Sequence, residues 1–118
     1  MPHDAGKWLH DILDAGGFIL EQTRSLSLEE YLADRAVQSI AERQFITIGE
    51  ALNRLHKYAP KIAQEVEDYK QIIQFRNIVV HGYDVIDSTI TWGIITGKLP
   101  QLLEIAQRLI DESLADSE

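Results

Sequence analysis

The sequence predicts an all-α protein, an up-and-down helical bundle of about five helices formed by residues 1–118 as a single domain. Three observations indicate this fold class. Apolar residues recur three and four positions apart through most of the chain, which is the spacing of one face of an α-helix. Capping and helix-breaking residues divide these stretches into separate helices. No segment alternates strictly enough for a half-buried strand, and the β-rich run at 85–92 lies between helical signals.

The apolar spacing predicts a first helix from about Asp4 to Arg24. A second helix should begin at Ser27, because the Ser27 hydroxyl and the Glu30 carboxylate can bond to each other's unpaired backbone amides. One apolar stripe continues through the second helix as far as Leu55, which predicts a long helix with Gly49 as its weak point. The first stripe comprises Trp8, Leu9, Ile12, Ala15, Ile19 and Gln22, and the second Tyr31, Leu32, Ala36, Ile40, Arg43, Thr47 and Leu55.

The second half of the chain carries further start and stop signals. Pro60 ends the long helix and suits the first turn of a short one, because its missing N–H is not needed there. The next helix should run from about Asp68 to His81 and stop at Gly82, the residue best suited to a left-handed cap.

Asp87 can cap a segment over residues 88–96. Gly97 and Pro100 should then separate this segment from a last amphipathic helix. The inward face of that helix would carry Leu102, Leu103, Ala106, Leu109 and Ile110.

Composition excludes several function classes. No apolar run approaches the roughly 20 residues that span a bilayer, and the first residues lack the order of a signal peptide, so we expect a cytoplasmic protein without membrane association. The absence of cysteine excludes disulfides, thiolate metal sites and cysteine nucleophiles. His3, His10 and His56 have no metal-ligand spacing, so we predict neither a metal nor another cofactor.

The net charge of −8 argues against a general nucleic-acid binder. Residues 51–83 are an exception, since five cations and three acids give this stretch +2 while the rest of the chain sums to −10. Arg54, Lys57 and Lys61 are therefore the candidate RNA-binding residues, with Tyr58 among them as a candidate aromatic contact. The alternative interpretation is that so small an imbalance arises by chance.

The segment "FRNIVVHGY" at 75–83 places an arginine and a histidine among core residues. Five positions separate Arg76 from His81, so on a straight helix their directions differ by about 140° and their Cα atoms by roughly 7.5 Å along the axis. If the helix ends at Gly82, both charged groups could converge on its end. Two such helix ends placed across a two-fold axis would give a cleft with two arginines and two histidines.

This pairing suits RNA cleavage without a metal. The reaction needs a base for the ribose 2′-OH, an acid for the leaving 5′-oxygen and a cation for the crowded phosphorane. His81 can act as acid or base near neutral pH, Arg76 matches phosphate oxygens, and Asn77 could orient a phosphate or the imidazole. The structural alternative is that the histidine caps helix carbonyls while the arginine pairs with a nearby aspartate, and for an isolated Arg-x4-His this alternative is favoured.

Residues 76–83, "RNIVVHGY", resemble the Arg-x4-His-x-Tyr signature of HepT-like toxins in the HEPN superfamily. The likeness extends to "LADRAVQSIAERQFITIGEALNRL" at 32–55, which is similar to the long second helix of that family. It also extends to "ITWGIITGKLPQLL" at 90–103, which is similar to its C-terminal part.

The resemblance implies a HEPN-like homodimer with metal-independent endoribonuclease activity and Arg76 and His81 as the catalytic pair. It also implies a toxin–antitoxin system, in which a minimal nucleotidyltransferase antitoxin transfers AMP to the tyrosine of the signature, here Tyr83. The alternative for Tyr83 is an aromatic that closes the helix end. The alternative for the chain is a catalytically silent helical module that binds the transferase or a nucleotide. The presence of both Arg76 and His81 favours the nuclease.

Overall fold

The computed structural model describes residues 4–66, 70–74 and 87–117, and the side chains of these residues as far as 113. Its helices are α1 (Ala5–Thr23), α2 (Leu28–Ala33), α3 (Arg35–Tyr58), α4 (Pro60–Ala63), α6 (Ser88–Gly93), the π-helical turn η1 (Ile94–Lys98) and α7 (Leu99–Ser117). Residues 70–74 are also helical, and the described ranges contain no strand. The prediction of an all-α fold is confirmed for the described residues.

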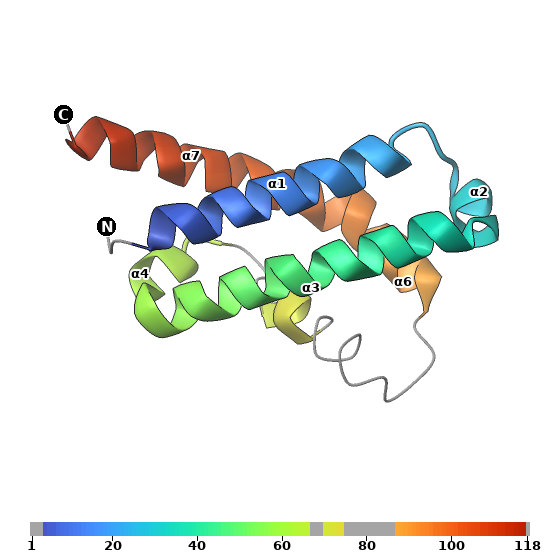
Figure 1. The fold of residues 1–118 in the computed structure, drawn as a ribbon, viewed down its shortest axis with the longest axis horizontal. Coiled ribbons are helices and arrows are strands. Elements are labelled where there is room, and N and C mark those ends of the chain that lie inside the picture. Colours follow the sequence, from blue (N-terminus) through green and yellow to red (C-terminus); the bar gives the residue numbers. More distant parts are fainter. Residues whose placement is uncertain (1–3, 67–69, 75–86, 118) are drawn as a thin grey trace.

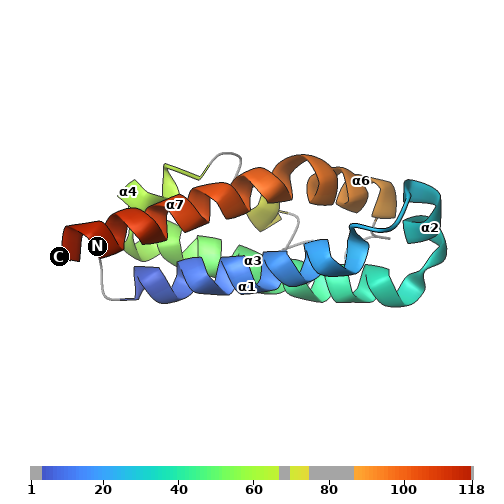
Figure 2. The ribbon, with the colours of Figure 1, turned by 90° about the horizontal axis from the view of Figure 1, so that it is seen from above.

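The three longest helices define two layers. α1 and α3 lie side by side in opposite directions, and α6, η1 and α7 cross them as one continuous rod, with α2 at one end and α4 at the other (Figures 1 and 2). α1 packs against both α3 and α7 and is therefore the central element of the core. Within the described ranges, no helix is both long and apolar enough to cross a membrane.

The first predicted helix is confirmed almost residue for residue, since α1 spans Ala5–Thr23. Five members of its predicted stripe are buried, and Gln22 is only partly covered. The five are Trp8, Leu9, Ile12, Ala15 and Ile19.

The predicted continuous helix from Ser27 to Leu55 is wrong, because the helix is interrupted at Asp34. The start is as predicted: Ser27 Oγ accepts the Glu30 N–H at 3.1 Å, and Glu30 Oε1 accepts the Ser27 N–H at 3.0 Å. Asp34 then adopts an extended conformation, φ −112° and ψ 92°, and its carboxylate caps a new helix by accepting the Val37 N–H at 3.1 Å. Gly49, the predicted weak point, lies buried inside the uninterrupted α3.

This break also changes which residues are buried. In the predicted stripe Leu32 is 43% exposed, and Ala36 and Arg43 are exposed as well. The apolar face that α3 in fact buries runs through Ala41, Phe45, Ile48, Leu52 and Leu55. These residues follow the three-and-four spacing of one helix, whereas the predicted stripe combined two helices whose phases are unrelated across Asp34.

The signals after Asp87 have mixed outcomes. Asp87 is the N-cap of α6, with its carboxylate accepting the Thr89 N–H at 2.9 Å, as predicted. The predicted separation at Gly97 and Pro100 is wrong, because α6 continues through η1 into α7 without a break. Pro100 has no N–H and its ring crowds the preceding turn, so the helix widens here and Leu99 donates its N–H to the Ile94 carbonyl, five residues earlier.

A glycine permits the close approach of α1 and α7. A Cβ atom on Gly16 would lie 2.6 Å from Leu103 Cδ2 and 3.1 Å from Leu99 Cδ1. The neighbouring Gly17 has open space at the same position and is exposed. Helix packing therefore requires a glycine at position 16 and does not require one at position 17.

Substitutions at these two glycines should have opposite effects on stability. Gly16→Val should lower the free energy of unfolding by about 1–3 kcal/mol, because its methyl groups overlap α7. Gly17→Ala should raise it by about 0.5–1 kcal/mol, because alanine costs less backbone entropy in a helix and meets nothing there. Urea denaturation of both variants checks this, and a Gly16→Val protein as stable as the wild type would contradict the packing at this point.

Tyr31 is the buried side chain whose polar atom, Oη, lacks a hydrogen-bond partner among the described residues. The residue is 0% exposed, and its ring centroid lies 5.1 Å from that of Trp92. Burial, with the negative charge of Glu42 as a smaller cause, raises the pKa of Tyr31 from 10.0 to about 12. An unpaired buried hydroxyl costs about 1–3 kcal/mol.

Tyr31→Phe should therefore raise the free energy of unfolding at pH 7, by about 1 kcal/mol, because it keeps the ring and removes a hydroxyl that has no partner among the described residues. Its advantage should grow above about pH 10, because unfolded wild-type chains release the phenolic proton there while folded chains hold it until about pH 12. Denaturant titrations at pH 7 and near pH 11 measure both effects. A variant less stable than the wild type at both pH values would show that the hydroxyl has a partner.

Candidate functional site

The sequence-predicted site residues divide into two groups. Arg76, Asn77, His81 and Tyr83 lie outside the described residues. The candidate RNA-binding residues lie inside them and are all exposed, two near the end of α3 and the third, Lys61, on α4. Among the described residues, the candidate site is therefore the side of the bundle that carries Arg54 and Lys57.

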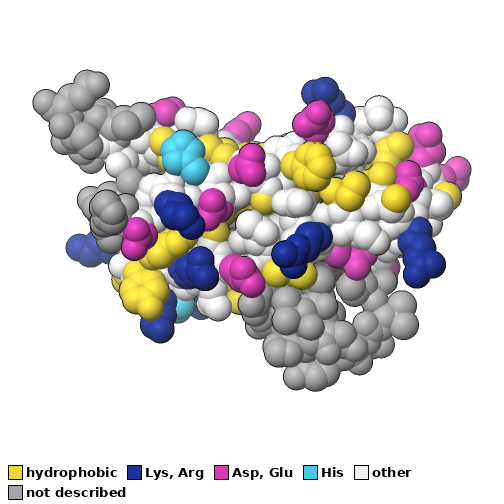
Figure 3. Space-filling view, viewed as in Figure 1, with side chains coloured by type: hydrophobic (Ala, Val, Ile, Leu, Met, Phe, Trp, Pro, Cys, Tyr) yellow, Lys and Arg dark blue, Asp and Glu magenta, His cyan; other side chains and the backbone are white. Residues whose placement is uncertain are grey.

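An open groove of about 710 Å³ follows the C-terminal half of α3. The α3 groove, as we call it, is lined by Glu50, Asn53, Arg54, His56, Lys57 and Tyr58. Burial of Leu52 and Leu55 fixes the rotation of α3, and this turns Arg54 and Lys57 outward. Figure 3 shows Lys and Arg side chains at the α4 end of this face, around exposed hydrophobic surface.

A second hollow of about 240 Å³ adjoins the α3 groove and lies between α3 and residues 70–74. Asn53 and His56 line both hollows, and Lys70, Ile73 and Gln74 complete the second. Gln74 precedes Arg76 by two residues in the chain. Lys61 lines neither hollow in the described part of the protein, so it is the least integrated of the three candidate RNA-binding residues.

The sequence did not identify Asn53, His56 and Lys70 as lining residues of these hollows. The signal for Asn53 and His56 was their spacing of three, which places them on one face of α3 once the helix is phased correctly. The predicted stripe ran through Asp34 with the wrong phase, so this face could not be separated from the buried one. Lys70 entered only the charge balance of residues 51–83, because nothing in the sequence places it beside α3.

An aromatic pair closes the α4 end of the groove. Tyr58, the last residue of α3, stacks on Trp8 of α1 with ring centroids 5.8 Å apart and planes inclined by 30°. The ammonium of Lys57 lies 5.2 Å from the centroid of the Tyr58 ring. The groove thus combines positive charge with an exposed aromatic ring, the two features that single-stranded nucleic acid binds.

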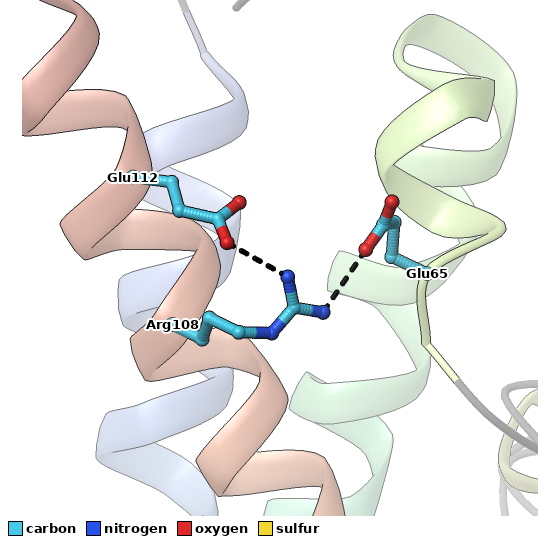
Figure 4. Close-up of polar contacts among 3 residues, drawn as sticks. All are labelled: Glu65, Arg108 and Glu112. Carbon is cyan, nitrogen blue, oxygen red and sulfur yellow. Dashed lines mark hydrogen bonds and ion pairs between the residues drawn. The ribbon is translucent and has the colours of Figure 1, made fainter.

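An ion-pair network holds the turn that leads from α4 toward residues 70–74. Arg108 of α7 donates to Glu65 at 2.9 Å and to Glu112, one turn further along α7, also at 2.9 Å (Figure 4). About half of each side chain is exposed, so water screens both pairs and each contributes little to the stability of the fold. The Glu65 contact is important because of where it lies in the chain. It links the turn after α4 to α7, and Lys70, a lining residue of the second hollow, follows soon after in the sequence.

No three His, Asp or Glu side chains gather into a metal-binding group within the described ranges. What the groove offers is electrostatic and stacking contact. Arginine and lysine side chains can hold phosphate oxygens, and an exposed phenol ring can hold a base.

The model of the family "Ribonuclease HepT-like" matches residues 12–109 of the chain. This protein belongs to the HepT-like family. The match covers both hollows beside α3 and the whole of the "RNIVVHGY" motif, so the family relationship includes the part of the chain in which the site was predicted.

Several similar proteins have names that refer to RNA cleavage. A Methanocaldococcus jannaschii protein provisionally named an RNase is 27% identical over 120 residues, covering 98% of this HepT-like chain and 94% of its own. The protein named "Probable ribonuclease HepT" of Thermococcus cleftensis is 26% identical over 95 residues, covering 80% and 86%. A Caldanaerobacter subterraneus protein, also provisionally named an RNase, is 25% identical over 105 residues, covering 89% and 93%. No solved structure matches this chain significantly.

Proposed function

We propose that this HepT-like protein is a metal-independent endoribonuclease and the toxin of a toxin–antitoxin pair. The observation that carries the proposal is the family match over residues 12–109, within which the chain has both the arginine and the histidine of the motif. The names of the similar proteins support RNA as the substrate. The described α3 groove supports it independently, since it offers cations on a chain whose net charge is −8.

The proposed reaction is an attack of the ribose 2′-oxygen on the neighbouring phosphorus. His81 takes the 2′-OH proton as the new P–O bond forms, and the P–O5′ bond breaks when a general acid protonates the leaving oxygen. A homodimer would supply that acid as the second copy's histidine. Arg76 stabilises the negative charge of the phosphorane, and Asn77 orients the phosphate or the imidazole. The products are a 2′,3′-cyclic phosphate and a 5′-hydroxyl.

The α3 groove suits the role of guiding RNA toward this pair. Arg54 and Lys57 line the groove itself, and Lys70 lines the hollow that continues it. The lining then reaches Gln74, two residues before Arg76 in the chain. Because the rest of the surface is acidic in sum, phosphate binding should depend on these few cations, with Lys61 as an outer contact.

Control by a nucleotidyltransferase would act on Tyr83. The phenol oxygen attacks the α-phosphorus of ATP, pyrophosphate leaves, and the tyrosine carries AMP through a new P–O bond. Tyr83 is two residues from His81, so the added phosphate would bring negative charge next to the catalytic pair and occupy space that RNA needs. The alternative, a silent module that only binds the transferase or a nucleotide, gives no reason for the arginine and histidine to occur together.

Purified protein free of modification should cleave RNA in the presence of EDTA and leave 2′,3′-cyclic phosphate ends. Arg76→Ala and His81→Ala should each lower the cleavage rate by about 10²–10⁴-fold, because each removes a group that acts on the transition state. Gel analysis of end-labelled RNA measures the rates. Lys7→Ala, an exposed change on α1, is the matched control for loss of one cation. Intact RNA with the wild-type protein would favour the silent module.

Co-expression with a minimal nucleotidyltransferase should add one or more AMP units to the protein and stop RNA cleavage. Tyr83→Phe should keep its mass and its activity under the same conditions, because it lacks the attacking oxygen. Intact-mass spectrometry gives the first result and the RNA cleavage assay the second. Tyr58→Phe is the matched control, since Tyr58 is an exposed tyrosine outside the motif. An AMP adduct that persists in Tyr83→Phe would move the modification to another residue.

A further inference from the structure

The aromatic pair at the end of α3 is built as a platform. Tyr58 is 56% exposed, whereas Trp8 beneath it is only 7% exposed and belongs to the core. The two ring centroids are 5.8 Å apart. The main chain next to Tyr58 is also fixed. Ala59 caps α3 by donating its N–H to the Leu55 carbonyl at 2.7 Å, and α4 begins at the next residue, Pro60. An exposed ring fixed in this way has little conformational entropy to lose on binding.

The surroundings of Tyr58 are cationic. Arg54 lies four residues before it, one turn along the same face of α3, and both line the α3 groove. The Lys57 ammonium lies 5.2 Å from the ring centroid. Its long flexible side chain allows the ammonium to move from the ring to a phosphate, which leaves the ring to a base.

Phe18 provides an internal comparison. It is also an exposed aromatic, at 40%, and it lines an open groove of about 560 Å³ on α1. That groove contains Asp14 and Glu21 and no cation among its described lining residues. Aromatic exposure is therefore similar at the two places, and charge distinguishes them. Only the surroundings of Tyr58 would attract a polyanion.

We propose that Tyr58, supported by Trp8, is a stacking subsite for one unpaired base of single-stranded RNA, with Arg54 and Lys57 holding the adjoining phosphates. The inference deepens the proposed ribonuclease function and rests on it for the choice of RNA. Bases inside an A-form duplex are stacked on their neighbours and present no free face, so a duplex can use the cations and not the ring. The subsite would therefore select unpaired segments.

The test measures binding separately from cleavage. Fluorescence anisotropy, with the full chain carrying His81→Ala to keep the RNA intact, compares an unstructured RNA of about 12 nucleotides with a duplex of the same length. Tyr58→Ala should weaken single-strand binding by roughly 5- to 100-fold, and Tyr58→Phe should leave it within about 2-fold of the Tyr58 protein, because the ring does the stacking. Duplex binding should not change. Phe18→Ala is the matched control and should change neither.

Two further readouts separate stacking from phosphate contact. The first is the slope of the logarithm of affinity against the logarithm of salt concentration. Lys57→Ala should reduce this slope by about one phosphate contact, whereas Tyr58→Ala should leave it unchanged. RNA that carries 2-aminopurine should lose fluorescence when its base stacks on the ring, and this quenching should disappear in Tyr58→Ala. Circular dichroism checks that each variant is folded, with Tyr58→Phe as the conservative change.

The outcomes distinguish this inference from the proposed function. Unchanged single-strand affinity and quenching in a folded Tyr58→Ala protein would overturn the stacking subsite, even if the wild type cleaves RNA. Equal losses of affinity for the single strand and the duplex would also overturn it, because they would mean that the groove binds only the phosphates. Binding that depends on Tyr58 in a protein without ribonuclease activity would support the subsite and reject the proposed catalysis.

Discussion

The burial of one apolar seam along α3 is the constraint on which the rest of the structure depends. Phe45, Ile48, Leu52 and Leu55 are each 0% exposed, and α3 packs along α1 over most of its length. Burying each such side chain contributes about 1.5–3 kcal/mol. Rotating α3 by a single residue would carry Arg54 into the core in place of Leu55. The apolar face therefore fixes the opposite face, and the cations and Tyr58 of the α3 groove are a geometric consequence of the core.

Local signals in the sequence were sufficient to predict most of the helices. The first helix, the capping box at Ser27, the start of a short helix at Pro60 and the cap at Asp87 each depend on residues within one turn. The failures occurred where a local signal had two structural solutions. Asp34 can lie inside a helix or end one and cap the next, and Pro100 can break a helix or be accommodated by a wider turn. Packing of the neighbouring helices decides between them, and a single sequence does not contain that information in local form.

The candidate site was predictable to different degrees for similar reasons. The roles proposed for Arg76 and His81 rest on side-chain chemistry together with the family resemblance, and both residues lie within the matched range 12–109. Charge alone pointed to Arg54 and Lys57. The hollow that Asn53 and His56 of α3 form with Lys70 could be found only from the fold, because these side chains come from separate parts of the chain. The support of Tyr58 by Trp8, 50 residues away in the sequence, could not be predicted from periodicity.

The division of charge over the surface bears on how such a protein could discriminate among nucleic acids. A chain of net charge −8 repels polyanions at long range, so an RNA that binds must gain enough from a few local cations to offset this repulsion. Attraction by Arg54, Lys57 and Lys70 weakens steeply as salt rises, whereas stacking on an uncharged ring depends little on salt. At physiological ionic strength the balance therefore shifts from charge toward base contact. With the proposed stacking subsite, a small basic groove on a chain of net negative charge would favour RNA that presents an unpaired base over RNA that presents phosphates alone.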